Sequence, residues 1–246
     1  MEATNAKEGE TALKPALLAD LPPETLKRNV GEILANLAKN TYENSTPAKL
    51  IAVTKTVSPT VINRLHALEI RDIAENRAQV ALPKLPHIET DFRLHWIGRL
   101  QTNKVKDIID KVCLLHSLDR PALAEEAERR AEQHGRVLPA LVQVNIACEP
   151  QKAGFSVEEV RPFLRRMKDY HCLQVCGLMS IMPLDADEEA LTGWFRGMRE
   201  LFEQLRGEAM EGVEMRELSM GMSHDYVLAA RQGATMVRVG TALYRA

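Results

Sequence analysis

Lys55 closes an apolar run, Leu50-Ile51-Ala52-Val53-Thr54, shortly before Ser58-Pro59, a pair typical of a helix start. A lysine at the end of a strand that opens into a cavity is partly desolvated, which weakens its preference for the charged form. The neutral amine is the form that attacks an aldehyde or ketone to make a Schiff base. Lys55 is therefore a candidate covalent anchor for a carbonyl ligand, and the alternative is a solvated lysine at a strand end.

Two short segments near the end of the chain are suited to binding a phosphate. Residues 219–225 read Ser-Met-Gly-Met-Ser-His-Asp, and residues 238–241 read Arg-Val-Gly-Thr. Glycines such as Gly240 let backbone N–H groups approach an anion, Ser223 and Thr241 add hydroxyl donors, and a helix after residue 223 adds a favourable dipole. Each segment alone is also explained by a turn and a helix cap, but both follow the last two predicted strands, where barrels bind phosphate.

Other polar residues lie in or at the ends of predicted strands. Strand alternation puts Arg238 on the face opposite its two valine neighbours, so it points into a barrel mouth unless it pairs with a carboxylate at the strand end. Asn76 ends a second predicted strand. His95, His116 and Asn145 lie within or beside strands, where such residues are more often hydrogen-bonded core residues than ligand contacts.

The elements that would position these residues alternate along the chain. Residues Leu26, Val30, Ile33, Leu34 and Leu37 recur at helical spacing and predict a leading amphipathic helix. Strands are predicted near residues 50–54, 70–74, 94–98, 112–117, 140–146, 173–179, 215–219 and 235–239. Because strands separated by helices run parallel, eight such units close into a single (β/α)8 TIM barrel with its active mouth at the C-terminal ends of the strands. An open doubly wound α/β sheet is the alternative. We predict a polar, mobile segment over residues 1–20 and one barrel domain over residues 21–246.

The composition argues against several classes of function. Of the 246 residues, 45% are hydrophobic and 27% charged, and the formal net charge is -2, so neither a disordered chain nor a nucleic-acid partner is expected. No apolar run is long enough to predict a membrane span, and the first residues resemble neither a signal nor a transit peptide, so a cytoplasmic protein is expected. The four cysteines form no Cys-x-x-Cys pair and are predicted to be small core residues in a reducing compartment, with no metal site.

A lysine, an arginine and a phosphate cradle at one barrel mouth predict an aldehyde with a phosphate tail, and pyridoxal 5′-phosphate meets all three requirements. The chain resembles the pyridoxal phosphate homeostasis proteins, also called proline synthetase co-transcribed bacterial homologue proteins, over most of its length. The segments that carry the resemblance are Ile51-Ala52-Val53-Thr54-Lys55, Glu75-Asn76, residues 95–104, Val144-Asn145-Ile146, Lys152-Ala153-Gly154, Gly177-Leu178-Met179, residues 219–225 and residues 237–241.

That resemblance implies a role for each candidate residue. Lys55 is implied to be the Schiff-base lysine, Asn76 to line the cofactor beside it, and Arg238 to face the pyridine nitrogen. The residues implied to hold the phosphate are Ser223, Gly240 and Thr241. The resemblance also implies a monomer that acts in vitamin B6 homeostasis, with apo-forms of pyridoxal phosphate enzymes as partners.

The chain departs from the family pattern at two places. Ile73-Ala74 stands where the family usually has Phe-Gly before Glu-Asn, next to the implied cofactor. After Tyr244, where the family usually has glycine, the chain reads Arg245-Ala246.

The implied site is compatible with a binder or an enzyme. An arginine holds its proton too tightly to protonate the pyridine nitrogen, which leaves the ring a weak electron sink. Racemisation usually needs a second base, which the barrel-type alanine racemases take from an additional β domain; Tyr226 and Tyr244 are the nearest substitutes here. We therefore predict a pyridoxal phosphate binder without catalysis. One alternative is a fold-type III racemase or lyase, and another is a barrel whose Lys55 forms Schiff bases with a sugar phosphate, as class I aldolases do.

Overall fold

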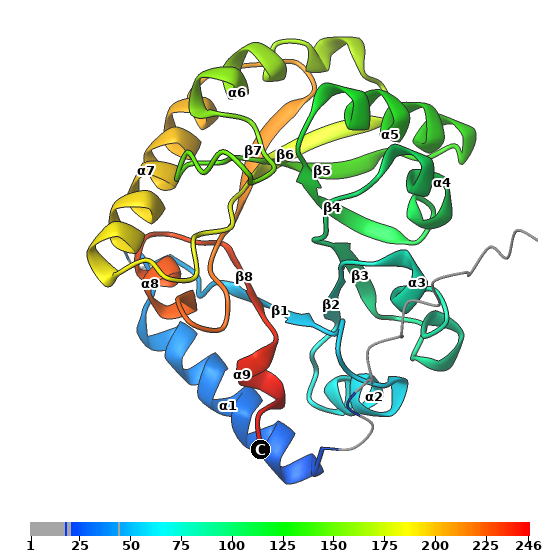
Figure 1. The fold of residues 1–246 in the computed structure, drawn as a ribbon, viewed down its shortest axis with the longest axis vertical. Helices are drawn as coiled ribbons and strands as arrows, with labels where there is room; N and C mark the ends of the chain where they lie inside the picture. The colour runs from blue at the N-terminus through cyan, green and yellow to red at the C-terminus, as the bar shows by residue number, and fades with distance from the viewer. Residues whose placement is uncertain (1–17, 19–20, 44) are drawn as a thin grey trace, which may run out of the picture.

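Eight parallel strands form a closed barrel in the structure, a computed structural model that describes residues 18, 21–43 and 45–246 (Figure 1). The strands are β1 (Lys49–Val53), β2 (Asp72–Glu75), β3 (Arg93–Trp96), β4 (Val112–Leu118), β5 (Leu138–Gln143), β6 (Leu173–Met179), β7 (Val213–Ser219) and β8 (Met236–Val239). The barrel closes where β8 pairs with β1, with Leu50 opposite Val237. The predicted barrel is confirmed, and the open sheet is excluded because its two edges would have to be unpaired.

Helices surround the barrel, as Figure 1 shows. They are α1 (Pro23–Lys39), α2 (Pro59–Ala67), α3 (Ala78–Ala81), α4 (Val105–Ile108), α5 (Pro121–Gln133), α6 (Val157–Leu164), α7 (Glu188–Arg206), α8 (Tyr226–Arg231) and α9 (Thr241–Tyr244), with 3-10 turns η1 (Leu85–His87), η2 (Thr102–Lys104) and η3 (Met167–Asp169). No helix among the described residues is long and apolar enough to cross a membrane. The predicted mobile segment, residues 1–20, lies outside the described residues apart from Leu18, whose backbone bonds to Thr56 and Ser58.

The predicted leading helix is confirmed as α1, with one correction to its apolar stripe. Leu26, Val30, Ile33 and Leu37 are buried, whereas Leu34 is 41% exposed. Consecutive helical residues are about 100° apart, so residue 34 turns away from the stripe that residue 33 belongs to.

The buried residues form two clusters that lie on the two faces of the sheet. The larger packs the outer face of the strands against the helices. The smaller comes from strand residues and fills the lumen; its members are Ile51, Val53, Ala74, Leu114, Leu141, Cys176, Met179 and Met236. Strand alternation explains the division, because Val237 and Val239 belong to the outer cluster while Met236 belongs to the lumen.

Helix α1 holds the C-terminal turn of the barrel in place. Figure 1 shows α1 beside α9, and the buried Asn29 side chain joins them. Its Nδ2 donates to the carbonyls of Leu243 at 3.0 Å and Arg245 at 2.9 Å. These bonds satisfy carbonyls at the end of α9, which a short helix cannot satisfy internally. The segment after Tyr244 is therefore fixed by an asparagine from the other end of the chain.

The prediction that the cysteines are core residues is wrong for one of the four. Cys176 is buried and Cys113 and Cys172 are half-buried, but Cys148 is exposed. All four are free thiols. Burial raises the pKa of Cys113 and of Cys176 to about 11, so these two thiols stay protonated and unreactive at neutral pH.

Gly177 in β6 lies at a close approach of two strands and gives a test of the barrel's packing. A Cβ at this position would lie 1.8 Å from the backbone oxygen of Glu217 in β7. We expect Gly177→Ala to lower the free energy of unfolding by at least about 3 kcal/mol, because the two strands would have to separate. The measurement is urea unfolding followed by circular dichroism.

The matched control is Gly193→Ala in α7, where a Cβ meets nothing within 4 Å. Alanine in a helix should stabilise the protein by up to about 1 kcal/mol there, the opposite sign. Equal effects at both positions would contradict this account of β6 and β7.

Candidate functional site

The end of β1 is anchored so that Lys55 projects from the C-terminal rim of the barrel. Lys55 lies two residues after the end of β1 and is exposed, whereas its neighbour Thr54 is fully buried. The Thr54 backbone N–H donates to the carbonyl of Ala74 at 2.9 Å, and its hydroxyl lies 2.8 Å from Glu75 Oε1. These two bonds fix the backbone at the end of the strand, from which the Lys55 side chain extends.

A buried ion pair between Lys84 and Glu75 also holds this strand end. Glu75 was named from the sequence, whereas Lys84 was not. Lys84 Nζ lies 2.9 Å from Glu75 Oε1 and donates to the carbonyl of Thr54 at 2.8 Å. The Lys84 and Glu75 side chains are only 4% and 3% exposed. A buried pair of this kind is costly to break, because removing one partner leaves an uncompensated charge. Lys84 lies in an irregular segment, so no periodicity distinguishes it from a solvated lysine.

The two phosphate-binding candidates meet as predicted. Ser223 Oγ accepts the backbone N–H of Gly240 at 3.2 Å and that of Ala242 at 3.3 Å. A Cβ on Gly240 would lie 3.3 Å from Val53 Cβ, so this turn also reaches the end of β1, two residues before Lys55. Amide N–H groups that converge on one oxygen are the donor arrangement that binds a phosphate oxygen.

Two details of this cradle differ from the sequence-based expectation. The helix that follows Ser223 begins only at Tyr226, and the donors at Ser223 come instead from the start of α9. Thr241 is exposed at that start.

Arg238 points into the lumen, as alternation predicts. It is 3% exposed, and its guanidinium donates to Ser219 Oγ at 2.6 Å and to the Ser180 carbonyl at 2.7 Å. These bonds use two of its five N–H donors, which leaves others for an acceptor at the mouth. The alternative partner considered from the sequence, a carboxylate at the strand end, is replaced by a hydroxyl and a carbonyl.

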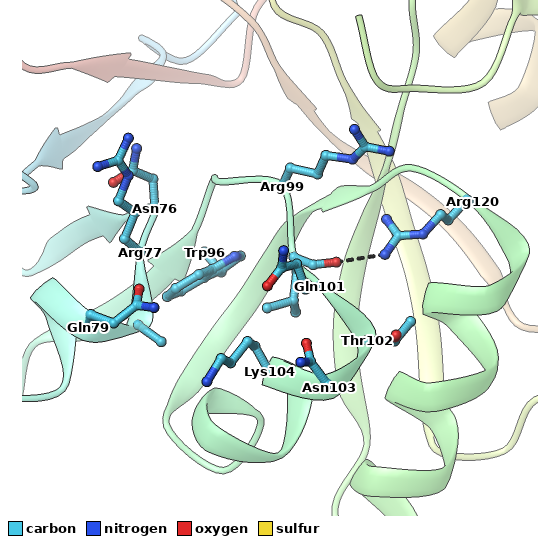
Figure 2. Close-up of a pocket in the computed structure, with 12 residues that line it drawn as sticks. Asn76, Arg77, Gln79, Trp96, Arg99, Gln101, Thr102, Asn103, Lys104 and Arg120 are labelled. Atoms are coloured by element: carbon cyan, nitrogen blue, oxygen red, sulfur yellow. Dashed lines mark hydrogen bonds between the residues drawn. The ribbon is translucent and has the colours of Figure 1, made fainter. Parts of the chain in front are cut away.

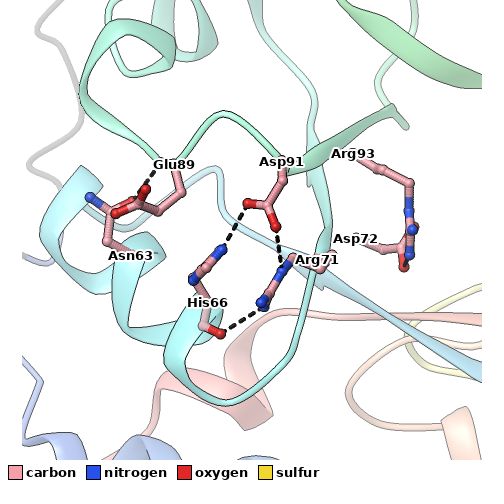
Figure 3. A network of polar contacts seen from close by, with 7 residues as sticks. All are labelled: Asn63, His66, Arg71, Asp72, Glu89, Asp91 and Arg93. Atoms are coloured by element: carbon pink, nitrogen blue, oxygen red, sulfur yellow. Dashed lines mark hydrogen bonds and ion pairs between the residues drawn. The ribbon is translucent and has the colours of Figure 1, made fainter.

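A chain of hydrogen bonds crosses the lumen from Ser219 to the opposite end of the barrel. His116 Nδ1 lies 2.9 Å from Ser219 Oγ, His116 Nε2 lies 2.9 Å from His95 Nδ1, and His95 Nε2 lies 2.9 Å from Asp72 Oδ1. Arg93 donates to Asp72 from the barrel's N-terminal rim, where Figure 3 shows the two side chains together. The prediction that both histidines are hydrogen-bonded core residues is confirmed; the chain they form was not predicted, because it joins four strands.

The hydrogen bonds in this chain connect Arg238 to Asp72. Because Ser219 Oγ accepts from Arg238, its own hydrogen is available to His116 Nδ1. One proton lies between His116 Nε2 and His95 Nδ1, and His95 Nε2 donates to the carboxylate of Asp72. The buried guanidinium of Arg238 and the buried carboxylate of Asp72 are thus joined through two imidazoles.

The pKa values agree with this arrangement. Burial alone would raise the pKa of Asp72, but hydrogen bonds from Arg93 and His95 outweigh it and hold that pKa far below its usual range. Burial, together with His95 and Arg238, holds the pKa of His116 well below its usual value. Burial lowers the pKa of Arg238 to about 10, which leaves it a cation at neutral pH.

Asn76 lies at the rim between two neighbouring loops. It follows β2, and a Cβ on Gly98 would lie 2.2 Å from its backbone oxygen, so the loop after β3 packs directly on it. Ile73 and Ala74, the departures from the family pattern, form regular β2 pairs with Ala52 and Val53. The presence of Ile73-Ala74 in place of Phe-Gly therefore leaves the strand before Asn76 intact.

Three other residues singled out in the sequence lie elsewhere. Asn145 is outside β5, contrary to prediction, and its side chain bonds to the backbone of Glu149 in its own loop. The Tyr226 hydroxyl accepts from Asn36 on α1, and Tyr244 is buried in the outer cluster.

Comparison with known proteins identifies the family. Residues 26–246 match the model of the alanine racemase N-terminal domain. A pyridoxal phosphate homeostasis protein from Aquifex aeolicus is 40% identical over 198 residues, which cover 80% of this chain and 86% of the relative. The chain belongs to the pyridoxal phosphate homeostasis protein family.

Other members of this family and more distant barrels agree. A Pseudomonas aeruginosa pyridoxal phosphate homeostasis protein is 34% identical, covering 90% of this chain and 96% of the relative. PipY from Synechococcus elongatus, solved with PLP bound, is 31% identical with a TM-score of 0.80, covering 89% of this chain and all of that one. Alanine racemase from Corynebacterium glutamicum is 15% identical with a TM-score of 0.69, covering 90% of this chain and 60% of its own, and shares the fold.

The buried imidazole chain predicts a pH dependence of stability for this family member. Because the pKa of His116 is lower in the folded protein than its usual 6.5, the unfolded chain takes up a proton first as the pH falls. The contribution of neutral His116 to the free energy of unfolding is thus fully present above pH 6.5. It is lost below pH 6.5, by up to about 1.4 kcal/mol per pH unit. We expect His116→Gln to flatten the pH dependence of the unfolding free energy between pH 6.5 and 5.

The control for this measurement is His134→Gln at an exposed position, which should leave the slope unchanged. Asp72 does not interfere, because a depressed carboxyl pKa makes its contribution constant above pH 5. An unchanged slope in His116→Gln would show that this imidazole is not held neutral.

Proposed function

We propose that this protein binds pyridoxal 5′-phosphate at the C-terminal mouth of the barrel and acts as a non-catalytic carrier in vitamin B6 homeostasis. Lys55 is the proposed covalent anchor for the cofactor's aldehyde carbon. The proposed phosphate ligands are Ser223, Gly240 and Thr241. Asn76 is proposed to line the ring and Arg238 to face its nitrogen.

The convergence of two backbone amides on Ser223 beside the end of β1 is the observation that carries this proposal. The amides of Gly240 and Ala242 already hold an oxygen atom, and the same turn touches Val53. The phosphate donors and the amine of Lys55 therefore belong to one end of the lumen. A family relative solved with PLP bound supports the choice of ligand.

The environment of Arg238 supports a carrier over an enzyme. Bound pyridoxal phosphate supplies an electron sink whose strength depends on protonation of its ring nitrogen. A guanidinium with a pKa of about 10 gives up no proton at neutral pH, so it donates a hydrogen bond and leaves that nitrogen unprotonated. The relatives are named as homeostasis proteins, which agrees with this reasoning.

The positions of the two tyrosines support the same conclusion. A second base would have to face the ring from the side opposite Lys55. The Tyr226 hydroxyl is bonded to Asn36 at 2.9 Å, on the outside of the barrel. Tyr244 is buried, and burial, followed by the charge of Glu75, raises its pKa above the usual range, so it stays protonated. We propose that the cofactor is passed on to apo-enzymes as partners, by a protein that acts as a monomer.

Two lysines near opposite ends of β1 provide the first test. After addition of pyridoxal phosphate we expect a visible absorbance band, and after borohydride reduction we expect peptide mass mapping to find the label on Lys55. The Lys55→Ala variant should lose both signals. Lys49→Ala should keep both, because Lys49 is also exposed but begins β1 at the opposite end of the barrel.

Label spread over surface lysines would contradict the proposed anchor. Turnover of an amino acid by the pure protein, abolished in Lys55→Ala, would contradict the proposed absence of catalysis while leaving cofactor binding intact.

The Asn29 clamp provides a test of the phosphate cradle. We expect Asn29→Ala to weaken binding of pyridoxal phosphate by roughly ten-fold and binding of pyridoxal much less, because only the phosphate uses the turn that Asn29 secures. Fluorescence titration with both ligands measures the difference.

Asn36→Ala is the matched control on the same helix, since Asn36 bonds to α8 through Tyr226 and not to α9. An equal loss of affinity for both ligands in Asn29→Ala would argue that the turn does not contact phosphate.

A further inference from the structure

A cavity of about 750 Å³ lies outside the lumen, between the loops that follow β2 and β3. Figure 2 shows its lining: Arg77 and Gln79 come from one side, and residues 99–104 and Arg120 from the other. The volume is within the range of pockets that bind small molecules. Of the residues named in the cofactor proposal, Asn76 alone lines this cavity.

The lining of this cavity is cationic, although the chain as a whole has a net charge of -2. Arg77, Arg99, Lys104 and Arg120 line it, and no aspartate or glutamate does. Cations that line one concave surface repel one another and attract an anion. The lining therefore favours a negatively charged ligand.

Neighbouring carboxylates balance only part of this charge. Arg99 and Arg120 share Asp119, one on each of its oxygens, and Lys104 lies 3.6 Å from Asp107. The Arg77 side chain is exposed and makes no ion pair or side-chain hydrogen bond with any residue that the structure describes. Four cations thus face two carboxylates, which leaves two positive charges for a ligand.

Trp96 supplies an independent indication of a ligand. This side chain is 2% exposed and lines the cavity, yet its Nε1 has no hydrogen-bond partner among the described residues. Figure 2 shows the indole nitrogen on the side that faces Gln101. A buried N–H without a partner costs about 1–3 kcal/mol, and an acceptor within the cavity would remove that cost.

The walls of the cavity are held at a fixed separation. A Cβ on Gly98 would lie 2.2 Å from the Asn76 backbone oxygen, so the two loops touch at one edge. On the other side, Arg120 donates to the carbonyl of Leu100 at 2.8 Å, a bond drawn in Figure 2. The donors are therefore preorganised, which reduces the entropy lost when a ligand binds.

We propose that this cavity is a binding site for a small organic phosphate with two or more negative charges, separate from the cofactor mouth. Three of its four cations are arginines, whose planar guanidinium groups match the geometry of phosphate oxygens. The volume of the cavity between two fixed loops suits a small molecule, and the net negative charge of the chain does not suit a nucleic acid.

Trp96 makes the site directly measurable. The chain has two tryptophans, so Trp194→Phe leaves Trp96 as the sole indole. We expect fructose 1,6-bisphosphate, which does not absorb at tryptophan wavelengths, to change the fluorescence of cofactor-free Trp194→Phe protein saturably, with an affinity that falls as salt is added. Calorimetry on the unmodified chain measures the same affinity without relying on that substitution.

Variants of the lining should weaken binding selectively. We expect Arg77→Gln and Lys104→Gln each to reduce affinity roughly ten-fold, the loss of one charge-assisted hydrogen bond. Neither change leaves a buried carboxylate without its partner. Substitution of Arg99 or Arg120 would do so, because both pair with Asp119, whose side chain is 2% exposed. Lys168→Gln, the same change at an exposed position in η3, at the opposite end of the barrel, should have no effect.

Further binding measurements distinguish this site from the cofactor mouth and from a site that binds any sugar or any anion. Lys55→Ala should bind the bisphosphate normally, so the result does not depend on the cofactor proposal. Fructose should not bind, and pyrophosphate should. Trp96→Phe, followed by calorimetry, should lower affinity. Absence of saturable binding, equal losses in the lining variants and Lys168→Gln, or tighter binding of citrate than of the bisphosphate would each overturn the assignment.

Discussion

Placing a guanidinium inside an apolar barrel is expensive, because a charge in a low-dielectric interior loses its hydration. Arg238 is 3% exposed and shares the lumen with an apolar cluster and with a chain of buried polar side chains. The barrel offsets that cost with a carbonyl at Ser180 and a hydroxyl at Ser219, and two imidazoles then lead to the carboxylate of Asp72. Much of the lumen's polar composition follows from this one requirement. Ordinary barrels fill these layers with branched aliphatic side chains.

Barrel closure assembles the mouth from distant parts of the chain. Because β8 pairs with β1, the turn at Gly240 touches Val53, and the loop at Ser223 is bonded to the same turn. The clamp from Asn29 brings the first helix to the last one. The candidate site therefore exists only when the barrel is closed, which links its formation to the stability of the whole fold.

The same rim carries two different electrostatic environments. Within the lumen, hydrogen bonds link the buried cation of Arg238 to the carboxylate of Asp72, which also pairs with Arg93. In the cavity beside α3, the cations outnumber their carboxylates, and the excess is available to a ligand. Asn76 lies between them, held against Gly98. An overall charge of -2 conceals both features, because net charge carries no information on where the charges lie.

The amino-acid sequence by itself was sufficient for the barrel, its eight strands and the pairing of the two phosphate segments. These depend on local periodicity and on the rule that parallel strands end at a common mouth. Alternation in β8 was also enough to direct Arg238 inward. The family resemblance narrowed the ligand to one cofactor, and the comparisons confirmed the family.

Tertiary structure decided everything that depends on contact between strands. Nothing local distinguishes Lys84 from a solvated lysine, or joins Asp72 to His116 through His95, because these contacts span different strands. The unpartnered nitrogen of Trp96 and the cationic cavity likewise arise from loops brought together by the fold. Periodicity encodes which face of an element is buried, whereas hydrogen bonds and charge balance depend on distances that only the closed barrel sets.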